Sequence, residues 1–411
     1  MDAEIIAVGS ELLTPQHTDT NSLYLTERLN NLGILVRYKT IVGDSKEDLA
    51  SVVRAALNRS PLIVLTGGLG PTEDDLTRDV VAEVLGRPLH EVAEIRTRIQ
   101  ERFARLGRPM PDNNLRQAQV PEGGDWLENR NGTAPGIWIE DHGRILLLLP
   151  GPPRELEPLF DTACFPRLER MSSGARIKTR VYKVVGLPES EVDQLIAPLY
   201  RPYQNPATTI LAALGTIEVH LRARGANDQE AEARLSELGD KIELALGDNV
   251  YSTKGESLEE VVGMYLVMRQ KTVAVAESCT GGLLAERLTR ISGSSAYFLG
   301  GAVCYSNGMK TRWAGVPAEL IEEHGAVSQP VAQALAEGVR GRTGASIGVG
   351  ITGIAGPTGG SNDKPVGTVF VALADERGTQ IREFHFPGSR DRVRYWATQM
   401  ALEMIRRRTR D

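Results

Sequence analysis

Cysteine, aromatic residues and long apolar runs are all scarce in this chain of 411 residues. The three cysteines, Cys164, Cys279 and Cys304, are too few and odd in number for a disulfide framework. The longest purely aliphatic run, residues 145–149, is far shorter than the roughly 18 residues that a membrane-spanning helix needs. These absences exclude a disulfide-stapled protein and a helical membrane protein, and they favour a reducing, cytoplasmic location.

Clustered metal ligands and a strong excess of one charge are also missing. A net charge of -6 and a pI of about 5.7 argue against a general nucleic-acid binder. The one basic cluster, residues 406–410, fits the negative end of a final helix, and residues 1–5 lack the positive segment of a signal peptide. The histidines show no zinc-type spacing; they are His17, His90, His142, His220, His324 and His385.

Alternating strand and helix patterns fill the first 160 residues. Apolar runs at 4–8, 34–42, 62–66 and 144–149 predict strands, and amphipathic patterns at 21–32 and 45–59 predict helices. Repeated strand–helix units predict a parallel sheet with helices on both faces.

The last 150 residues show α/β patterns again. Strands are predicted at 272–276, 297–304, 345–352 and 367–374, with 379–386 as a hairpin partner, and helices at 283–292 and 391–408. In between, strands at 180–185 and 216–223 and helices at 189–199 and 228–246 predict a small α+β module, followed by a polar connector at 251–257. The predicted fold class is α/β, with two doubly wound domains joined by that module.

The first candidate site is the stretch TGGLGPTEDDLTRD at residues 66–79, which follows a predicted strand end. Ligands of open parallel sheets bind beyond such ends, and glycines let backbone amides approach an anion. Asp74 and Asp75 are hard oxygen ligands suited to Mg²⁺ with a phosphate-bearing substrate. The structural alternative is a turn with an acidic helix start.

Two further loops support this site. The stretch NRNGTAPG at 129–136 is a second small-residue loop, and LPGPPRELEP at 149–158 brings Glu155 to the same rim. A proline-ordered loop that starts a helix is the alternative for the latter. Three such loops in one domain favour a metal-assisted phosphate or pyrophosphate site.

The second candidate site lies where a strand gives way to a helix at residues 277–282. Ser278 and Thr280 supply hydroxyls, and Gly281 and Gly282 supply unobstructed amides. A hydroxyl beside such donors suits acyl transfer, with a nucleophile next to an oxyanion hole. The same features fit a phosphate cradle or a simple helix cap.

A serine nucleophile needs a base, and the candidate is Lys310 in the stretch CYSNGMK. A lysine base must be neutral, so burial has to lower its pKa. Tyr305 would relay the proton or bond the serine. An exposed lysine at a helix start is the alternative, and Cys279 is a rival nucleophile whose side chain an extended backbone would point elsewhere.

A third glycine-rich loop, at residues 348–360, completes this site. Gly348, Gly350 and Gly353 have the spacing of the dinucleotide fingerprint, but its last glycine must open a helix, and the glycines and proline that follow prevent one. Thr352 stands at the strand end. Arg390, at the start of the last helix, would grip a phosphate or remain solvated.

Together these motifs resemble the CinA (competence/damage-inducible protein A) family over essentially the whole chain: VGSELL, LTGGLGPTEDDLT, NGTAPG, LPGPPRE, AESCTGG, YSNGMK and GITGIAGPTGG. The resemblance implies a molybdopterin-binding-like domain at 1–170, associated with ADP-ribose pyrophosphatase activity, a KH-like module at 175–250, and an NMN (nicotinamide mononucleotide) deamidase domain at 256–411. A cytoplasmic homodimer without membrane contact is expected.

The resemblance also assigns roles to residues. In the deamidase domain, which needs no cofactor, the catalytic residues would be Ser278, Tyr305, Lys310 and Thr352. Substrate would be bound there by Thr280, Gly281, Gly282, Asn307, Gly353, Gly356, Gly359, Gly360 and Arg390. Nucleotide would be bound in the first domain by Glu11, Gly67, Gly68, Gly70, Thr72, Asn131, Gly132, Thr133 and Gly151. A divalent metal such as Mg²⁺ would be held by Asp74, Asp75 and Glu155.

The sequence departs from the family pattern at two points. Residues 14–17 read Thr-Pro-Gln-His where the family usually shows a Gly-Gln pair, and residues 388–390 read Gly-Ser-Arg in place of Gly-Asp-Arg. The rival hypothesis is a non-enzymatic pterin- or nucleotide-binding adaptor linked to competence or DNA damage. A nucleic-acid role for the middle module is disfavoured, because residues 176–247 contain no Gly-x-x-Gly clamp.

Overall fold

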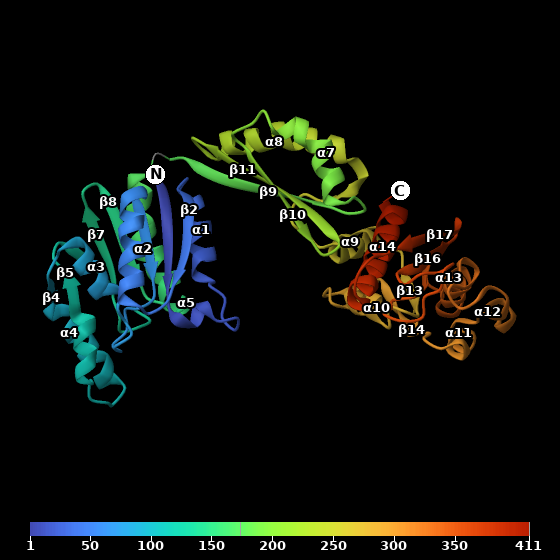
Figure 1. Cartoon of the computed structure of the whole chain (residues 1–411), viewed down its shortest axis with the longest axis horizontal. Coiled ribbons are helices and arrows are strands. Elements are labelled where there is room, and N and C mark those ends of the chain that lie inside the picture. Colours follow the sequence, from blue (N-terminus) through green and yellow to red (C-terminus); the bar gives the residue numbers. More distant parts are fainter. Residues whose placement is uncertain (173, 411) are drawn as a thin grey trace. The chain divides into compact units, whose positions relative to one another are not determined.

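The computed structural model describes residues 1–172 and 174–410, which divide into two compact units (Figure 1). The first contains Met1–Thr179 and Arg222–Ser236, and the second contains Arg180–Leu221 and the chain from Glu237 onward. The boundary between the units passes through the predicted middle module, whose limits of 175–250 stay a prediction. No described helix combines the length and apolar character required to cross a membrane.

The first unit contains a six-stranded sheet in the order β2-β1-β3-β8-β7-β6. Its strands are β1 (Asp2–Val8), β2 (Leu35–Val42), β3 (Leu62–Thr66), β6 (Gly124–Leu127), β7 (Gly136–Asp141) and β8 (Arg144–Leu149). A separate antiparallel pair is formed by β4 (Leu89–Glu91) and β5 (Gln119–Pro121).

Helices cover both faces of this sheet, as its strand sequences require. Successive residues of a strand point to opposite faces, so Ile63 packs with one helix layer and Leu62 with the other. One layer contains α2 (Lys46–Arg59), α3 (Thr77–Leu85) and α4 (Ala93–Arg105); the other contains α1 (Asn21–Asn30), α5 (Pro153–Leu159) and α6 (Phe165–Met171). Shorter helical segments are η1 (Ser10–Leu13), η2 (Asp112–Ala118) and η3 (Phe160–Cys164).

The sheet is mixed, so the prediction of a purely parallel sheet is wrong at one edge. Strands β2, β1, β3 and β8 are parallel, whereas β7 and β6 run antiparallel to their neighbours. The cause is the two-residue turn at His142 and Gly143, both with positive φ (46° and 79°), which joins β7 to β8. A turn this short makes a hairpin and cannot make a parallel crossover.

The middle of the chain forms a four-stranded sheet in the order β10-β11-β9-β12. Its elements are β9 (Arg176–Val184), α7 (Glu189–Tyr200), β10 (Ala207–Ala213), β11 (Thr216–Gly225), α8 (Asp228–Leu246), η4 (Gly247–Asn249) and β12 (Val250–Ser252). The expected connector at 251–257 is wrong at its start, because Tyr251 is buried in β12, which pairs with β9. Three residues are too few to show a strand pattern in the sequence.

The second unit also contains a five-stranded sheet in the order β14-β13-β15-β16-β17. Its strands are β13 (Val273–Glu277), β14 (Phe298–Val303), β15 (Ile347–Gly353), β16 (Thr368–Asp375) and β17 (Gly378–His385). Strands β14, β13 and β15 are parallel, and β16 and β17 are antiparallel. The predicted hairpin between the last two strands is confirmed.

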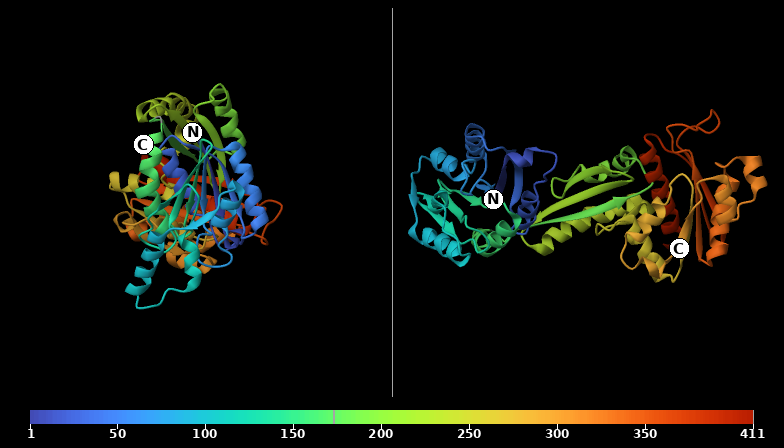
Figure 2. Two further views of the ribbon diagram at one scale, coloured as in Figure 1. Left: turned by 90° about the vertical axis from the view of Figure 1, so that its left-hand side faces the viewer. Right: turned by 90° about the horizontal axis from the view of Figure 1, so that it is seen from below.

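Helices again cover both faces. Val273 and Val275 pack with α9 (Leu258–Met268), α10 (Leu283–Thr289) and α14 (Arg390–Arg410), whereas Ala274 and Ala276 face α11 (Asn307–Ala314), α12 (Ala318–His324) and α13 (Gln329–Thr343). The red terminal helix and the orange helices accordingly lie on opposite sides of the sheet (Figure 2). A short segment, η5 (Ser294–Ala296), precedes β14. The loops at the carboxyl ends of β13, β14 and β15 therefore meet at one edge.

Candidate functional site

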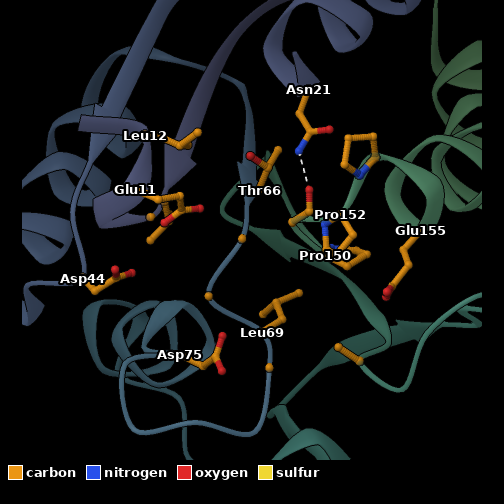
Figure 3. Close-up of a pocket in the computed structure, with 18 of the residues that line it drawn as sticks. Glu11, Leu12, Asn21, Asp44, Thr66, Leu69, Asp75, Pro150, Pro152 and Glu155 are labelled. Atoms are coloured by element: carbon orange, nitrogen blue, oxygen red, sulfur yellow. Dashed lines mark hydrogen bonds between the residues drawn. The ribbon is translucent and has the colours of Figure 1, made fainter. Parts of the chain in front are cut away.

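A cavity of about 580 Å³ lies at the carboxyl ends of β1, β3 and β8, three adjacent strands of the first unit (Figure 3). The loops that follow these strands form its wall, as expected for a parallel sheet. Nine predicted residues line the cavity: Glu11, Gly67, Gly68, Gly70, Asp74, Asp75, Thr133, Gly151 and Glu155. Three others that were predicted to bind nucleotide, Thr72, Asn131 and Gly132, are not among its lining residues.

The glycine loop after β3 passes too close to its neighbours for larger residues. At Gly67, with φ +92°, a Cβ atom would lie 2.2 Å from the carbonyl oxygen of Val8. The Thr77 hydroxyl donates to the Gly67 carbonyl at 2.8 Å and so fixes the loop to the start of α3. The backbone of this loop therefore faces the cavity with no glycine side chain to block a ligand.

Thr72 orients a cavity carboxylate. Its amide donates to the Asp75 carboxylate at 2.8 Å, and its hydroxyl donates to the same oxygen. Thr72 thus orients Asp75, and its predicted contact with a nucleotide stays a prediction.

Asn129 organises the loop at the opposite side of the cavity. Its amide nitrogen donates to Glu155 at 2.8 Å, while its side-chain oxygen accepts from the amides of Asn131 and Gly132 at 3.0 and 2.9 Å. Asn131 also donates to the carbonyl of Arg154 at 2.8 Å. Asn131 and Gly132 thus build the loop that holds Glu155. The signal that identifies Asn129 is the asparagine turn.

The lining of the cavity is strongly acidic. Six carboxylates surround it and no lysine or arginine is among the lining residues; the six are Glu11, Asp19, Asp44, Asp74, Asp75 and Glu155. Figure 3 shows Glu155 across the cavity from Asp44 and Asp75. An anion could bind here only with a cation to offset the repulsion.

The described residues include no group of three or more histidine, cysteine or acidic side chains placed to hold a metal ion. Asp74, Asp75 and Glu155 therefore line one cavity without forming a metal cage. Mg²⁺ commonly uses one or two carboxylates together with substrate phosphates, and the neighbours Asp74 and Asp75 fit that arrangement. The metal stays a prediction.

In the second unit, Glu277 controls the loop between β13 and α10. Its buried carboxylate accepts hydrogen bonds from the amides of Gly282, Leu284 and Ala285 at 3.1, 3.0 and 2.8 Å. The Gly281 amide donates to the Ser278 carbonyl at 3.1 Å. The expectation that Gly281 and Gly282 offer amides to an oxyanion or phosphate is therefore wrong, because both amides already have partners.

These glycines serve the turn itself. Gly281 and Gly282 have φ values of +60° and +94°, which other residues rarely adopt. Within the described chain, the amide of Thr280 lacks a hydrogen-bond partner, and its hydroxyl is enclosed without one. Thr280 is fully buried, however, so neither of these donors is open to solvent.

The Glu277 carboxylate should stabilise the second unit strongly. We expect Glu277→Ala to lower the free energy of unfolding by about 2–4 kcal/mol, since three buried amides lose their acceptor. Urea denaturation of the full chain measures this. The control Glu286→Ala, at an exposed ion pair with Arg290, should cost at most about 0.5 kcal/mol. Equal costs for the two variants would contradict the capping role.

Ser278 and Lys310 have the properties predicted for a nucleophile and a base. The Ser278 hydroxyl makes no hydrogen bond to the described residues and is not one of the fully enclosed oxygens. Lys310 is 2% exposed, which rules out the alternative of an exposed lysine, and burial lowers the pKa of its amine. Its Nζ donates to the Tyr305 carbonyl at 3.1 Å and has no hydrogen bond to Ser278.

Cys279 is a poor rival nucleophile. Burial raises the pKa of its thiol to about 12, so that the reactive thiolate is scarce at neutral pH. The positive charge of Lys310 opposes this shift for Cys279 and for Cys304. Ser278 follows β13, and Lys310 lies in the first turn of the helix that follows β14; these strands pair, with Glu277 opposite Val303 and the Cys304 amide donating to the Glu277 carbonyl at 2.7 Å. Both residues therefore come from the same edge of the sheet.

Two arginines of α14 bind this region. Arg390 donates to the Gly356 carbonyl and to the Tyr305 hydroxyl, both at 2.8 Å, so it is not merely solvated. The Tyr305 hydroxyl bonds Arg390 and not Ser278, which contradicts the predicted contact with the serine. Arg394, which sequence reasoning missed, donates twice to the Thr280 carbonyl, at 3.2 and 2.9 Å.

Thr352 has a structural contact where a catalytic one was predicted. Its buried hydroxyl donates to the Ala326 carbonyl at 2.7 Å and ties that segment to β15. Asn307 is exposed at the start of α11, behind the capping residue Ser306. Its substrate contact stays a prediction, as do those of the glycines at the end of β15 and in the next loop: Gly353, Gly356, Gly359 and Gly360.

Known proteins match the chain along its length. Three family descriptions apply in order: a probable molybdopterin binding domain at residues 4–170, the damage-inducible protein CinA KH domain at 179–252, and the CinA C-terminal domain at 255–409.

Relatives cover nearly the whole chain. A CinA-like protein of Koribacter versatilis is 54% identical over 412 residues, which cover 99% of this chain and 100% of the relative. A putative competence-damage inducible protein of Acetivibrio thermocellus is 44% identical over 407 residues, covering 99% and 98%. A solved CinA structure from Thermoplasma acidophilum is 32% identical, with a TM-score of 0.39, and covers 41% of this chain and 97% of its own. The chain belongs to the CinA family.

Proposed function

We propose that the C-terminal domain hydrolyses the carboxamide of NMN to nicotinic acid mononucleotide and ammonia. The observation that carries this proposal is the buried amine of Lys310, with a lowered pKa, in the region of an unpartnered serine hydroxyl. A neutral lysine is a competent general base for a serine nucleophile.

The reaction proceeds in two halves. Neutral Lys310 accepts the Ser278 proton as the serine oxygen attacks the carboxamide carbon. The C–N bond then breaks, and the lysine returns the proton to the leaving ammonia. Lys310 then takes a proton from water, and the hydroxide attacks the ester carbon. The lysine returns that proton to the Ser278 oxygen as the C–O bond breaks and nicotinic acid mononucleotide leaves.

The surrounding side chains suit the rest of this substrate. Arg390 carries the nearby positive charge, and its Nε is not used in the two contacts that it makes. Tyr305 is 58% exposed, so its ring is accessible to a flat heterocycle. We therefore assign the nucleotide phosphate to Arg390 and the pyridine ring to the side of Tyr305.

Product analysis tests this assignment. Purified protein incubated with NMN should yield ammonia and nicotinic acid mononucleotide in equal amounts. Release of nicotinamide would indicate cleavage of the glycosidic bond instead, and absence of product would leave the non-enzymatic adaptor as the better account. The names of relatives such as the putative competence-damage inducible protein of Acetivibrio thermocellus fit that rival hypothesis.

We propose a second activity, hydrolysis of the ADP-ribose pyrophosphate, for the first unit. The specific observation is the acidic cavity, where six carboxylates and backbone groups surround a space of about 580 Å³. A divalent cation held by Asp74 and Asp75 would supply the positive charge that a pyrophosphate needs there. The glycine loop after β3 contributes backbone groups without steric hindrance.

Removal of divalent metal should abolish ADP-ribose cleavage and leave ammonia release from NMN unchanged. Asp74→Asn should lower the cleavage rate at least about tenfold, since a metal ligand is weakened. The matched control is Glu73→Gln, because the adjacent Glu73 is fully exposed and does not line the cavity. Cleavage that resists a chelator, or equal rates for the two variants, would refute the metal role.

A further inference from the structure

A second hollow, of about 440 Å³, lies beside the acidic cavity in the first unit, between α4 and the chain segment that follows β6. We call it the arginine groove, because four arginines line it: Arg98, Arg102, Arg105 and Arg130. Two acids, Glu101 and Glu128, and the ring of Trp126 also line it. Its charge is thus opposite to that of the cavity.

The wall between the two hollows is thin. Thr133 lines both of them. Gly132 lines the groove, yet a Cβ atom there would lie 1.7 Å from the Glu155 carboxylate, which lines the cavity. Asn129, a groove residue, donates to the same carboxylate at 2.8 Å. A single layer of residues therefore separates the acidic environment from the basic one.

Two of the arginines are committed to the structure of the groove. Arg102 donates to the carbonyls of Arg130 and Asn131 at 3.2 and 2.9 Å and so holds the wall segment against α4. Arg98 pairs with Glu128 and lies over the Trp126 ring, 5.0 Å from its centroid.

The other two arginines retain free donors. Arg105 uses only its Nε, which donates to the Glu101 carbonyl at 3.4 Å, and its terminal nitrogens have no partner among the described residues. Arg130 is 83% exposed, and its Nε lies 3.5 Å from Glu128. Guanidinium groups with uncommitted nitrogens are suited to phosphate oxygens.

We propose that the arginine groove binds the adenosine 5′-phosphate end of a nucleotide whose other end occupies the acidic cavity. This inference rests on the second proposed activity, because it places the two halves of ADP-ribose on either side of the wall. The arginines bind the phosphate without a metal ion, and Trp126 offers an aromatic edge to the base. The scissile pyrophosphate then lies on the acidic side of the wall, in the cavity that Asp74 and Asp75 also line.

The probe is AMP, which carries only the proposed groove end, and its affinity is measured by calorimetry with the full chain in metal-free buffer. The double variant Arg105→Ala/Arg130→Ala should weaken AMP binding at least about tenfold and flatten its dependence on salt. The control Arg108→Ala removes one exposed arginine that is close to the groove in sequence but does not line it, and it should stay within about twofold. Both groove positions are exposed, so the fold should persist.

Two outcomes overturn the proposal: wild-type protein that does not bind AMP, or AMP binding that the double variant retains. The pyrophosphatase proposal fails separately. Loss of AMP binding in the double variant, together with a wild type that does not cleave ADP-ribose, would support the groove and reject the activity. Cleavage with an unchanged KM for ADP-ribose in the double variant would support the activity and reject the groove.

Discussion

Replacing Ser278 by alanine should reduce ammonia release from NMN by at least about 10³-fold, because the attacking oxygen is lost. The replacement removes a hydroxyl that makes no hydrogen bond to the described residues, so the fold should tolerate it. ADP-ribose cleavage by the same preparation should be unchanged, since the acidic cavity is built from residues 8–155. A coupled ammonia assay at saturating NMN measures the effect.

The control for this variant is the neighbouring Cys279→Ala. Its thiol is buried with a raised pKa of about 12 and is not available as a nucleophile, so ammonia release should stay within about threefold of wild type. Loss of activity in Cys279→Ala, combined with activity in Ser278→Ala, would reverse the assignment of the nucleophile.

Replacing Lys310 by methionine should lower kcat/KM for NMN by about 10²–10⁴-fold, the usual contribution of a general base. Methionine keeps an unbranched apolar stem in the buried position and removes only the amine. Lys310→Arg should be equally inactive, because a guanidinium stays protonated. Lys254→Met, at an exposed lysine of the same unit, is the control and should retain full activity.

The pH dependence gives a second test of Lys310. Burial lowers its pKa below the ordinary value of 10.5, so kcat/KM should rise with pH along a limb whose midpoint lies below that value. Between the lowered pKa of Lys310 in the folded protein and its ordinary pKa in the unfolded chain, the folded protein binds fewer protons. Below the folded pKa, Lys310 is charged in both states, so the free energy of unfolding is reduced by the full cost of burying that charge. Lys310→Met should therefore raise the Tm at neutral pH and abolish the limb. An unchanged limb in this variant would exclude Lys310 as the titrating base.

Much of the fold follows from periodicity alone. The buried runs at β1, β3 and β8, and the helices between them, are visible in the sequence because each strand contains a run of at least four apolar residues and each helix has one apolar face. The orientation of β7 and the strand at Tyr251 are not visible, because a two-residue turn and a three-residue strand depend on tertiary pairing.

The candidate sites divide in a similar way. Glycine loops at strand ends identified the cavity of the first unit, which nine of the predicted residues line. The hydrogen-bond partners inside each loop were beyond sequence reasoning, since they depend on three-dimensional contacts. Glu277 shows this most clearly, because its carboxylate takes the amides that a ligand was expected to use.

The arginine groove illustrates a further limit. Arg98, Arg102 and Arg105 recur along α4 at helical spacing, which on its own is typical of a solvated helix face. Their common orientation toward Arg130 becomes evident only when β6 and the following loop are placed beside that helix.

Identification of the acylated residue tests the central claim most directly. Wild-type protein is mixed with NMN, quenched in acid during turnover and digested, and the peptide that contains residues 274–289 is sequenced by mass spectrometry. The account predicts a nicotinoyl mononucleotide ester on Ser278, absent from Ser278→Ala. Turnover with an unmodified Ser278, or an adduct on Cys279, would contradict it.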